Sequence, residues 1–158
     1  MSYRILTICT GNICRSPMAE VVLAEKLAEA GLDVEVQSAA VTTEALGHAI
    51  DHRAARTLRA AGYRVPDRRA RQVSAEDFES FDLMLPMTRS HARALDRFAE
   101  RFGAGDLGAD IRLFRDFVPD DEVDVPDPWY GDQSDFDETL EIIEQAVPAI
   151  AEFVRENS

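Results

Sequence analysis

Cysteine is scarce in this chain of 158 residues, which contains only Cys9 and Cys14. Because the two lie five positions apart near the N-terminus, they cannot join distant segments, so a disulfide framework is excluded and a reducing compartment is expected. No stretch approaches the roughly 20 apolar residues of a membrane span, and the first residues lack the apolar core and cleavage site of a signal peptide. We therefore expect a cytoplasmic protein with no membrane partner, in which the cysteines have a chemical role.

Internal repeats, low-complexity tracts and interdomain linkers are also lacking, and a hydrophobic content of 46% suffices for a sizeable core. We expect one domain over residues 1–158. Positive charge is scarce in the second half, since residues 76–158 hold 22 acidic against 7 basic residues, and the net charge of the chain is −13. A nucleic-acid partner is not expected, because phosphate backbones favour a basic face. An anionic substrate would need a local positive pocket.

Apolar runs and helical periodicities alternate along the chain. The runs predict strands at 3–8, 34–37, 81–87 and 111–114. Helices are predicted from Ser16-Pro17 to Gly31, near 52–61, after Ser74, after Thr88 and from Ser134 onward, with a kink at Pro148. This alternation predicts an α/β fold, a single doubly wound domain with a four-stranded parallel sheet flanked by helices, whose ligands bind at the carboxyl ends of the strands.

The segment between the first predicted strand and helix has the composition of a phosphate-binding loop. Backbone N–H groups that turn into a helix N-terminus bind anions, and Gly11 is expected to adopt the unusual dihedral angles of such a loop. Arg15 can bind two phosphate oxygens at once and stays charged. Cys9, at the start of the loop, is the predicted nucleophile that forms a cysteinyl-phosphate. The predicted phosphate-binding residues are Thr10, Gly11, Asn12, Ile13, Cys14 and Arg15.

Two polar residues of this loop are predicted to support the nucleophile. Ser16 can donate its hydroxyl to the sulfur of Cys9, and the amide of Asn12 can hold a left-handed turn. The alternative is that Cys9 and Cys14 are merely small buried residues and Arg15 a surface charge. For Cys14 two interpretations stay open, packing or a reversible disulfide with oxidised Cys9.

A long loop rich in Pro and Asp, residues 116–134, follows the last predicted strand, and loops of this length in compact domains are usually functional. Phosphoryl transfer requires an acid that protonates the leaving oxygen. Asp127 is the predicted acid, because Pro128 holds it extended and residues 129–131 form a compact apolar turn beside it. No His-carboxylate cluster suggests a metal and the chemistry requires none, so neither a metal nor a cofactor is expected.

Four motifs of the chain together resemble the low-molecular-weight protein tyrosine phosphatases. They are Cys9–Pro17, Ser38-Ala39, Ala70-Arg71-Gln72 and Asp127–Gly131. The resemblance covers nearly the whole chain and implies hydrolysis of phosphotyrosine and aryl phosphates, with a phosphotyrosine protein or a small aryl phosphate as partner. It implies Cys9 as nucleophile, Arg15 as phosphate binder and Asp127 as general acid. It further implies a polar support made by Asn12, Ser16 and Ser38.

Two neighbours in the same fold are weighed as alternatives. Thioredoxin-linked arsenate reductases resemble the loop but use further cysteines downstream, and this chain has none after Cys14. Protein arginine phosphatases resemble it more closely but typically have Thr at the position of Ile13, where a branched apolar residue suits a phosphoaryl ring. We therefore predict phosphotyrosine, with phosphoarginine as the alternative. A third hypothesis is a catalytically weak relative that binds phosphate or senses redox state.

The chain departs from the family pattern at two places. Where many members have an aromatic residue after the second strand, this chain has residues 43–46, and Glu44 there would repel acidic phosphopeptides or select basic ones. Where many members have His before the Ala-Arg-Gln motif, this chain has Arg68 or Arg69, so the network that supports the phosphate loop is expected to differ.

Ile13, Glu44, Trp129 and Tyr130 form the predicted substrate wall. The chain has three histidines, and none of them is given a catalytic role; surface or satisfied core positions are expected for His48, His52 and His91.

Overall fold

The computed structural model describes residues 2–103 and 108–158. Its sheet has four parallel strands in the order β2-β1-β3-β4, which confirms the predicted α/β architecture. The strands are β1 (Tyr3–Cys9), β2 (Val34–Ala40), β3 (Leu83–Pro86) and β4 (Asp110–Ile111). The helices are α1 (Arg15–Glu29), α2 (His52–Ala60), α3 (Ala75–Ser80), α4 (Arg89–Phe102), the 3-10 helix η1 (Phe114–Phe117) and α5 (Gln133–Asn157).

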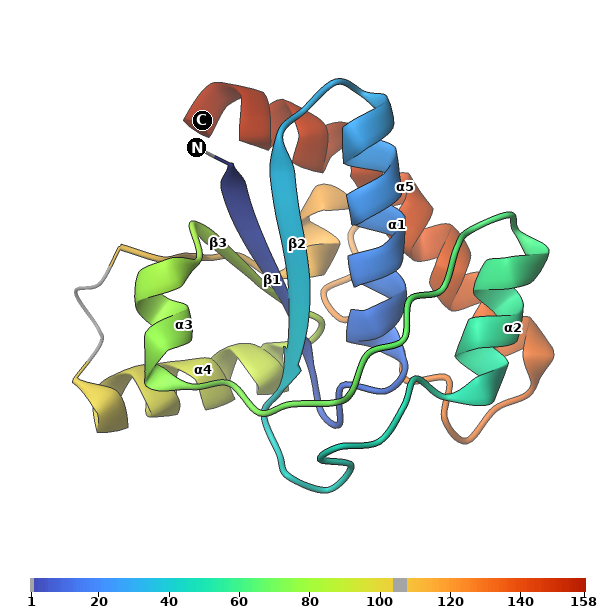
Figure 1. The fold of residues 1–158 in the computed structure, drawn as a ribbon, viewed down its shortest axis with the longest axis horizontal. Helices are drawn as coiled ribbons and strands as arrows, with labels where there is room; N and C mark the ends of the chain where they lie inside the picture. The colour runs from blue at the N-terminus through green and yellow to red at the C-terminus, as the bar shows by residue number, and fades with distance from the viewer. Residues whose placement is uncertain (1, 104–107) are drawn as a thin grey trace.

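Both faces of the sheet are covered by helices. In Figure 1, α1 and α5 lie on one side of the strands, and α3 and α4 lie on the other. Because side chains alternate along a strand, β1 contributes to both cores. Ile5 packs into the core on the α1 and α5 side, whereas Leu6 and Ile8 pack into the core on the α3 and α4 side.

Several predicted element boundaries are wrong. The fourth strand is not 111–114, because β4 ends at Ile111 after pairing with only two residues of β3, and the fully buried Phe114 starts η1. α1 begins at Arg15 with Cys14 as its N-cap, before the predicted Ser16-Pro17 start, since the loop turns directly into the helix.

The final helix also begins earlier than predicted. α5 starts at Gln133, because the carboxylate of Asp132 accepts the N–H group of Ser134 and caps the helix. α5 continues as one helix through Pro148. No helix within the two described ranges has the length and apolarity that crossing a membrane would require.

Caps at two other helices agree with the predictions and help to place the site. Ser74 and Asp77 form a reciprocal capping box at α3, and the Thr88 hydroxyl accepts the N–H group of His91 at the start of α4, over 3.1 Å. β1 and β3 are parallel neighbours, so the loop after Cys9 and the start of α4 emerge at the same edge of the sheet. This edge is where the candidate site lies.

Candidate active site

The loop between β1 and α1 has the backbone of an anion-binding site. Within the part of the chain that the structure describes, the N–H groups of residues 10–14 donate no hydrogen bond, so they remain available for an anion. Asn12 adopts a left-handed conformation with φ of 61°. The left-handed residue of the loop is thus Asn12 rather than Gly11, whose φ is not positive. A Cβ at Gly11 would instead lie 3.6 Å from Ala45 Cβ, so the loop passes close to this residue.

A chain of hydrogen bonds is directed at the sulfur of Cys9. The Asn12 Nδ2 group donates to Ser16 Oγ over 2.9 Å, and Ser16 Oγ lies 2.9 Å from Cys9 Sγ. Because Ser16 Oγ accepts from Asn12, its own hydrogen is free to point at the sulfur. The Ser16 hydroxyl is thus placed to donate a hydrogen bond to the Cys9 sulfur.

Arg68 binds the oxygen end of the Asn12 amide. The sequence had left open whether Arg68 or Arg69 supports the phosphate loop, and the structure shows that it is Arg68. Its guanidinium donates to Asn12 Oδ1 and, over 2.8 Å, to the backbone carbonyl of Asn12. The N–H group of Arg71 also donates to Asn12 Oδ1, over 3.2 Å. These donors orient the amide so that its NH₂ group faces Ser16.

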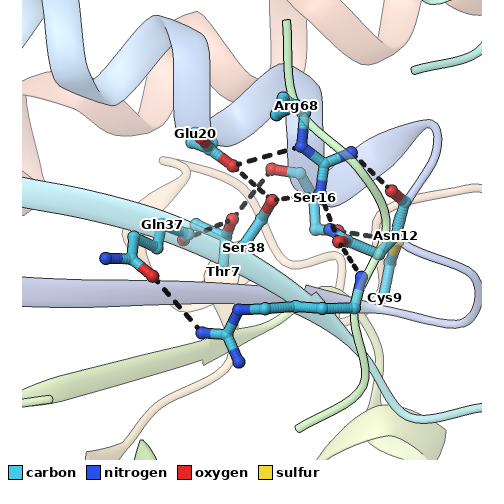
Figure 2. Close-up of polar contacts among 9 residues, drawn as sticks. Thr7, Cys9, Asn12, Ser16, Glu20, Gln37, Ser38 and Arg68 are labelled. Carbon is cyan, nitrogen blue, oxygen red and sulfur yellow. Dashed lines mark hydrogen bonds and ion pairs between the residues drawn. The ribbon is translucent and has the colours of Figure 1, made fainter. Parts of the chain in front are cut away.

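Arg68 is itself held by two residues of neighbouring elements. Figure 2 shows its guanidinium with Asn12 on one side and Glu20 and Ser38 on the other. Arg68 Nε lies 3.9 Å from Glu20 Oε1, and Arg68 donates to Ser38 Oγ over 3.2 Å, while Ser38 Oγ donates to Glu20. Ser38 therefore reaches the loop through Arg68. Glu20 was not predicted from the sequence, although its position one turn after Ser16 on α1 was a usable signal.

Arg15 and Asp127 face each other across the site. The Arg15 guanidinium donates to the Val125 carbonyl over 3.0 Å and lies 3.5 Å from Asp127 Oδ2. Only 6% of the Arg15 side chain is exposed, against 44% for Asp127, so a buried cation meets a carboxylate that solvent and substrate can reach. Asp127 Oδ1 accepts the N–H group of Trp129 over 3.0 Å.

These groups line a cleft with a volume of about 380 Å³. Its walls include every residue of the predicted substrate wall. The lining residues are Cys9, Thr10, Gly11, Ile13, Cys14, Arg15, Glu44, Ala45, His48, Asp127, Trp129 and Tyr130. Tyr130 is 92% exposed at the mouth, so most of its ring is available to a substrate.

His91 corrects the expectation of a surface or satisfied core histidine. It is 3% exposed, its Nε2 atom lies 2.8 Å from the hydroxyl of Thr10 in the loop, and its Nδ1 atom has no hydrogen-bond partner among the described residues. Burial lowers the pKa of His91 to about 4, and the charge of Arg15 acts in the same direction. His91 is therefore a neutral contact of the phosphate loop. Its position in the first turn after the third predicted strand was the available signal.

Cys14 is buried behind the loop, and both cysteines are free thiols. Burial raises the pKa of Cys14, and the nearby carboxylate of Asp51 adds to this effect. Cys14 is thus kept as a neutral thiol, and a neutral thiol is a poor nucleophile. No group of His, Cys, Asp and Glu side chains with the arrangement of a metal site occurs in residues 2–103 and 108–158.

A cysteine above an anion-binding loop, a buried arginine and a facing carboxylate define the class of cysteine-dependent phosphatases. The model of the family described as "Low molecular weight phosphotyrosine protein phosphatase" matches residues 4–158. The low molecular weight protein-tyrosine phosphatase A of Mycobacterium tuberculosis is 43% identical over 154 residues, which cover 94% of this chain and 90% of the relative. The chain therefore belongs to the low-molecular-weight phosphotyrosine protein phosphatase family and is a protein tyrosine phosphatase.

Solved structures agree with this assignment. The protein tyrosine phosphatase of Entamoeba histolytica superposes with a TM-score of 0.87 at 30% identity, covering 99% of each chain. The arginine phosphatase YwlE of Bacillus subtilis superposes with a TM-score of 0.84 at 27% identity, covering 98% of this chain and 97% of the other. The fold is thus shared by phosphatases that act on different substrates, and the substrate must be inferred from the site itself.

Proposed function

We propose that residues 1–158 form one phosphatase domain that hydrolyses phosphotyrosine in two steps, with Cys9 as nucleophile and Asp127 as general acid and then general base. The observation that carries this proposal is the single cleft in which Cys9, Arg15 and Asp127 meet, with Arg15 held 3.5 Å from Asp127. In the first step the sulfur attacks phosphorus, and the departing phenoxide takes its proton from Asp127. In the second step Asp127 removes a proton from water, which attacks the cysteinyl-phosphate and releases inorganic phosphate.

The contact between Arg15 and Asp127 suits this sequence of events. Without substrate, the guanidinium of Arg15 is the charge partner of the Asp127 carboxyl group. A phosphate dianion that binds Arg15 takes over this charge partner, so Arg15 and Asp127 act on the same phosphoryl group. The backbone N–H groups of residues 10–14 and Arg15 supply donors for the equatorial oxygens of the transition state.

The apolar walls of the cleft support an aryl substrate. Ile13 of the loop, Trp129 and Tyr130 all line the cleft. A tyrosine ring can pack against these side chains, whereas a phosphoguanidinium would leave its N–H groups facing an apolar wall. Glu44 also lines the cleft, so we propose a preference for phosphotyrosine peptides with basic flanking residues. A cytoplasmic location and the absence of nucleic-acid partners stay predictions.

The test is hydrolysis of a phosphotyrosine peptide at mildly acidic pH, with a phosphoarginine substrate in parallel. Cys9→Ser should abolish turnover, and Asp127→Asn should lower kcat/KM for the peptide about 10²-fold or more, as removal of a general acid does. Phosphoarginine should be hydrolysed more slowly than phosphotyrosine. An inert parent that still binds vanadate would contradict the catalytic proposal.

A further inference from the structure

Arg53, the second residue of α2, makes an unusual set of contacts with the loop that carries Asp127. Its guanidinium carbon lies 4.9 Å from the ring centroid of Trp129 and 4.8 Å from that of Phe136, the fourth residue of α5. It also donates to the Trp129 carbonyl over 3.0 Å. One cation thus contacts two aromatic rings and the main chain of the acid loop.

The other partner of Arg53 connects it to the phosphate loop. Asp51 Oδ1 and Oδ2 each lie 3.2 Å from nitrogens of the Arg53 guanidinium. The Asp51 carboxylate also caps α2 by accepting the N–H groups of Arg53 and Ala54, and its own backbone N–H group donates to the carbonyl of Ile13 over 2.8 Å. Ile13, Asp51, Arg53 and Trp129 are therefore joined in one continuous series of contacts.

The far end of this series is the general acid. Trp129, whose carbonyl accepts from Arg53, donates its own N–H group to Asp127 Oδ1. Burial holds only part of this segment, because Pro128 is buried but 44% of the Asp127 side chain and 92% of Tyr130 are exposed. The face of an aromatic ring attracts a cation, and a charge-assisted hydrogen bond is roughly twice as strong as a neutral one. These contacts are large enough to set the position of an exposed loop.

We propose that Arg53 is a positioning residue for the general acid: it sets the distance between Asp127 and the phosphate loop by holding Trp129 against α2. The inference rests on the proposed role of Asp127. A shift of about 1 Å in a catalytic group costs up to about 10²-fold in rate, so loss of this contact should be visible in kinetics. A purely structural role for Arg53 would instead change stability and affect all substrates equally.

Leaving-group dependence separates the two roles. A nitrophenolate leaves readily without protonation, whereas a phenolate, with a conjugate-acid pKa of about 10, needs the acid. The experiment therefore compares kcat/KM, which reports the first chemical step, for 4-nitrophenyl phosphate, phenyl phosphate and a phosphotyrosine peptide. The variants are Arg53→Gln, Arg53→Lys and Asp127→Asn, with Arg56→Gln as the matched control, because Arg56 is an exposed arginine on the same helix.

Arg53→Gln should lower kcat/KM for phenyl phosphate and the peptide by about 10-fold to 10²-fold, while 4-nitrophenyl phosphate changes by less than about threefold. Arg53→Lys should fall between the parent and Arg53→Gln, because it keeps the charge but loses the planar fork. Should Arg53→Gln not fold, Arg53→Lys alone carries the comparison. Arg56→Gln should match the parent.

The outcomes distinguish this inference from the proposed function. If Asp127→Asn discriminates against poor leaving groups and the Arg53 variants do not, the positioning role of Arg53 is overturned and the role of Asp127 stands. If Asp127→Asn shows no such discrimination, the proposed general acid is wrong, and the inference about Arg53 falls with it.

Discussion

A single amide, that of Asn12, sets the polarity of the nucleophile's surroundings. Arg68 and the N–H group of Arg71 donate to its oxygen, so its nitrogen faces Ser16, whose hydroxyl then points at Cys9. Because a guanidinium stays charged at every working pH, this orientation does not depend on a titrating group. Burial lowers the pKa of Arg68, and the charge of Glu20 opposes that effect.

Arg68→Met should therefore damage both stability and phosphate binding. It removes two donors from Asn12 and leaves the largely buried Glu20 without its charged partner, which should cost about 1–3 kcal/mol in the free energy of unfolding. Urea unfolding and the inhibition constant for vanadate measure the two effects. Arg69→Met is the matched control, since Arg69 is exposed. Equal losses in the two variants would contradict the role assigned to Arg68.

A second prediction for a single residue concerns His91 and the stability of the fold at acidic pH. Its pKa falls to about 4 in the folded state through burial and Arg15, against the opposing carboxylates of Asp127 and Asp124, whereas an unfolded histidine has a pKa of about 6.5. The folded state thus binds this proton less readily. The resulting stability is fully present above about pH 6.5 and is lost as the pH falls toward about 4, by up to about 3 kcal/mol.

Urea unfolding between pH 7 and pH 4 tests this linkage. His91→Gln keeps a polar group near Thr10 and cannot titrate, so its stability should fall less steeply over about pH 6.5 to 4 than that of the parent. Parallel curves for the two proteins would mean that His91 does not contribute to acid unfolding.

At the scale of elements, the acid loop and the start of α5 form one unit. The Gly131 N–H group donates to the Pro128 carbonyl over 2.9 Å and closes the turn. Asp132 and Asp135 then cap α5 reciprocally, with the Asp132 N–H group donating to Asp135 Oδ2 over 2.9 Å. Gly131 has no positive φ; it is required because a Cβ there would lie 2.8 Å from Asp135 Cβ.

Gly131→Ala should therefore displace Asp135, weaken the cap by about 1 kcal/mol and loosen the loop of Asp127. We expect a lower kcat/KM for the phosphotyrosine peptide together with a lower melting temperature. Gly103→Ala is the control, because it forces alanine to a φ of 66° at the end of α4, at a cost of about 1–2 kcal/mol, away from the cleft. If Gly103→Ala lowered kcat/KM as much as Gly131→Ala, the coupling of loop and helix would be refuted.

At the scale of the whole molecule, a net charge of −13 surrounds a site that binds an anion. The positive groups that serve the phosphate, Arg15 and the loop N–H groups, are recessed at the edge of the sheet, while Glu44 and Asp127 line the cleft nearer to solvent. Electrostatic steering over the surface therefore opposes acidic substrates, and the local donors act only at contact.

Salt should affect substrates according to their flanking charge. For a phosphotyrosine peptide with acidic flanks, kcat/KM should rise with salt as repulsion is screened over a Debye length of about 10 Å at 0.1 M, and for one with arginine flanks it should fall. Glu44→Gln should reduce the difference between the peptides at low salt. Identical salt dependence of both peptides would show that the charge surrounding the cleft does not influence binding.

The order of the elements and the residues of the phosphate loop could be predicted from local sequence patterns. Cys9, Arg15 and Ser16 lie within eight consecutive residues, so a strand, a tight loop and a helix suffice to bring them together. Asp127 could be proposed because the Pro and the aromatic turn after it constrain it locally. The cleft brings Asp127 together with Cys9 and Arg15, and the catalytic roles of the three residues stay predictions.

Which distant residues support the site depends on how the whole chain packs. Thr10 and His91 are 81 positions apart, and Arg53 and Trp129 are 76 apart, so no local pattern identifies either pair. The end of the fourth strand was also decided in this way, because the buried Phe114 leaves the edge of the sheet for the core beside α1 and α5. These residues become neighbours because the whole chain packs around a shared core. Their spacing along the sequence gives no sign of that contact.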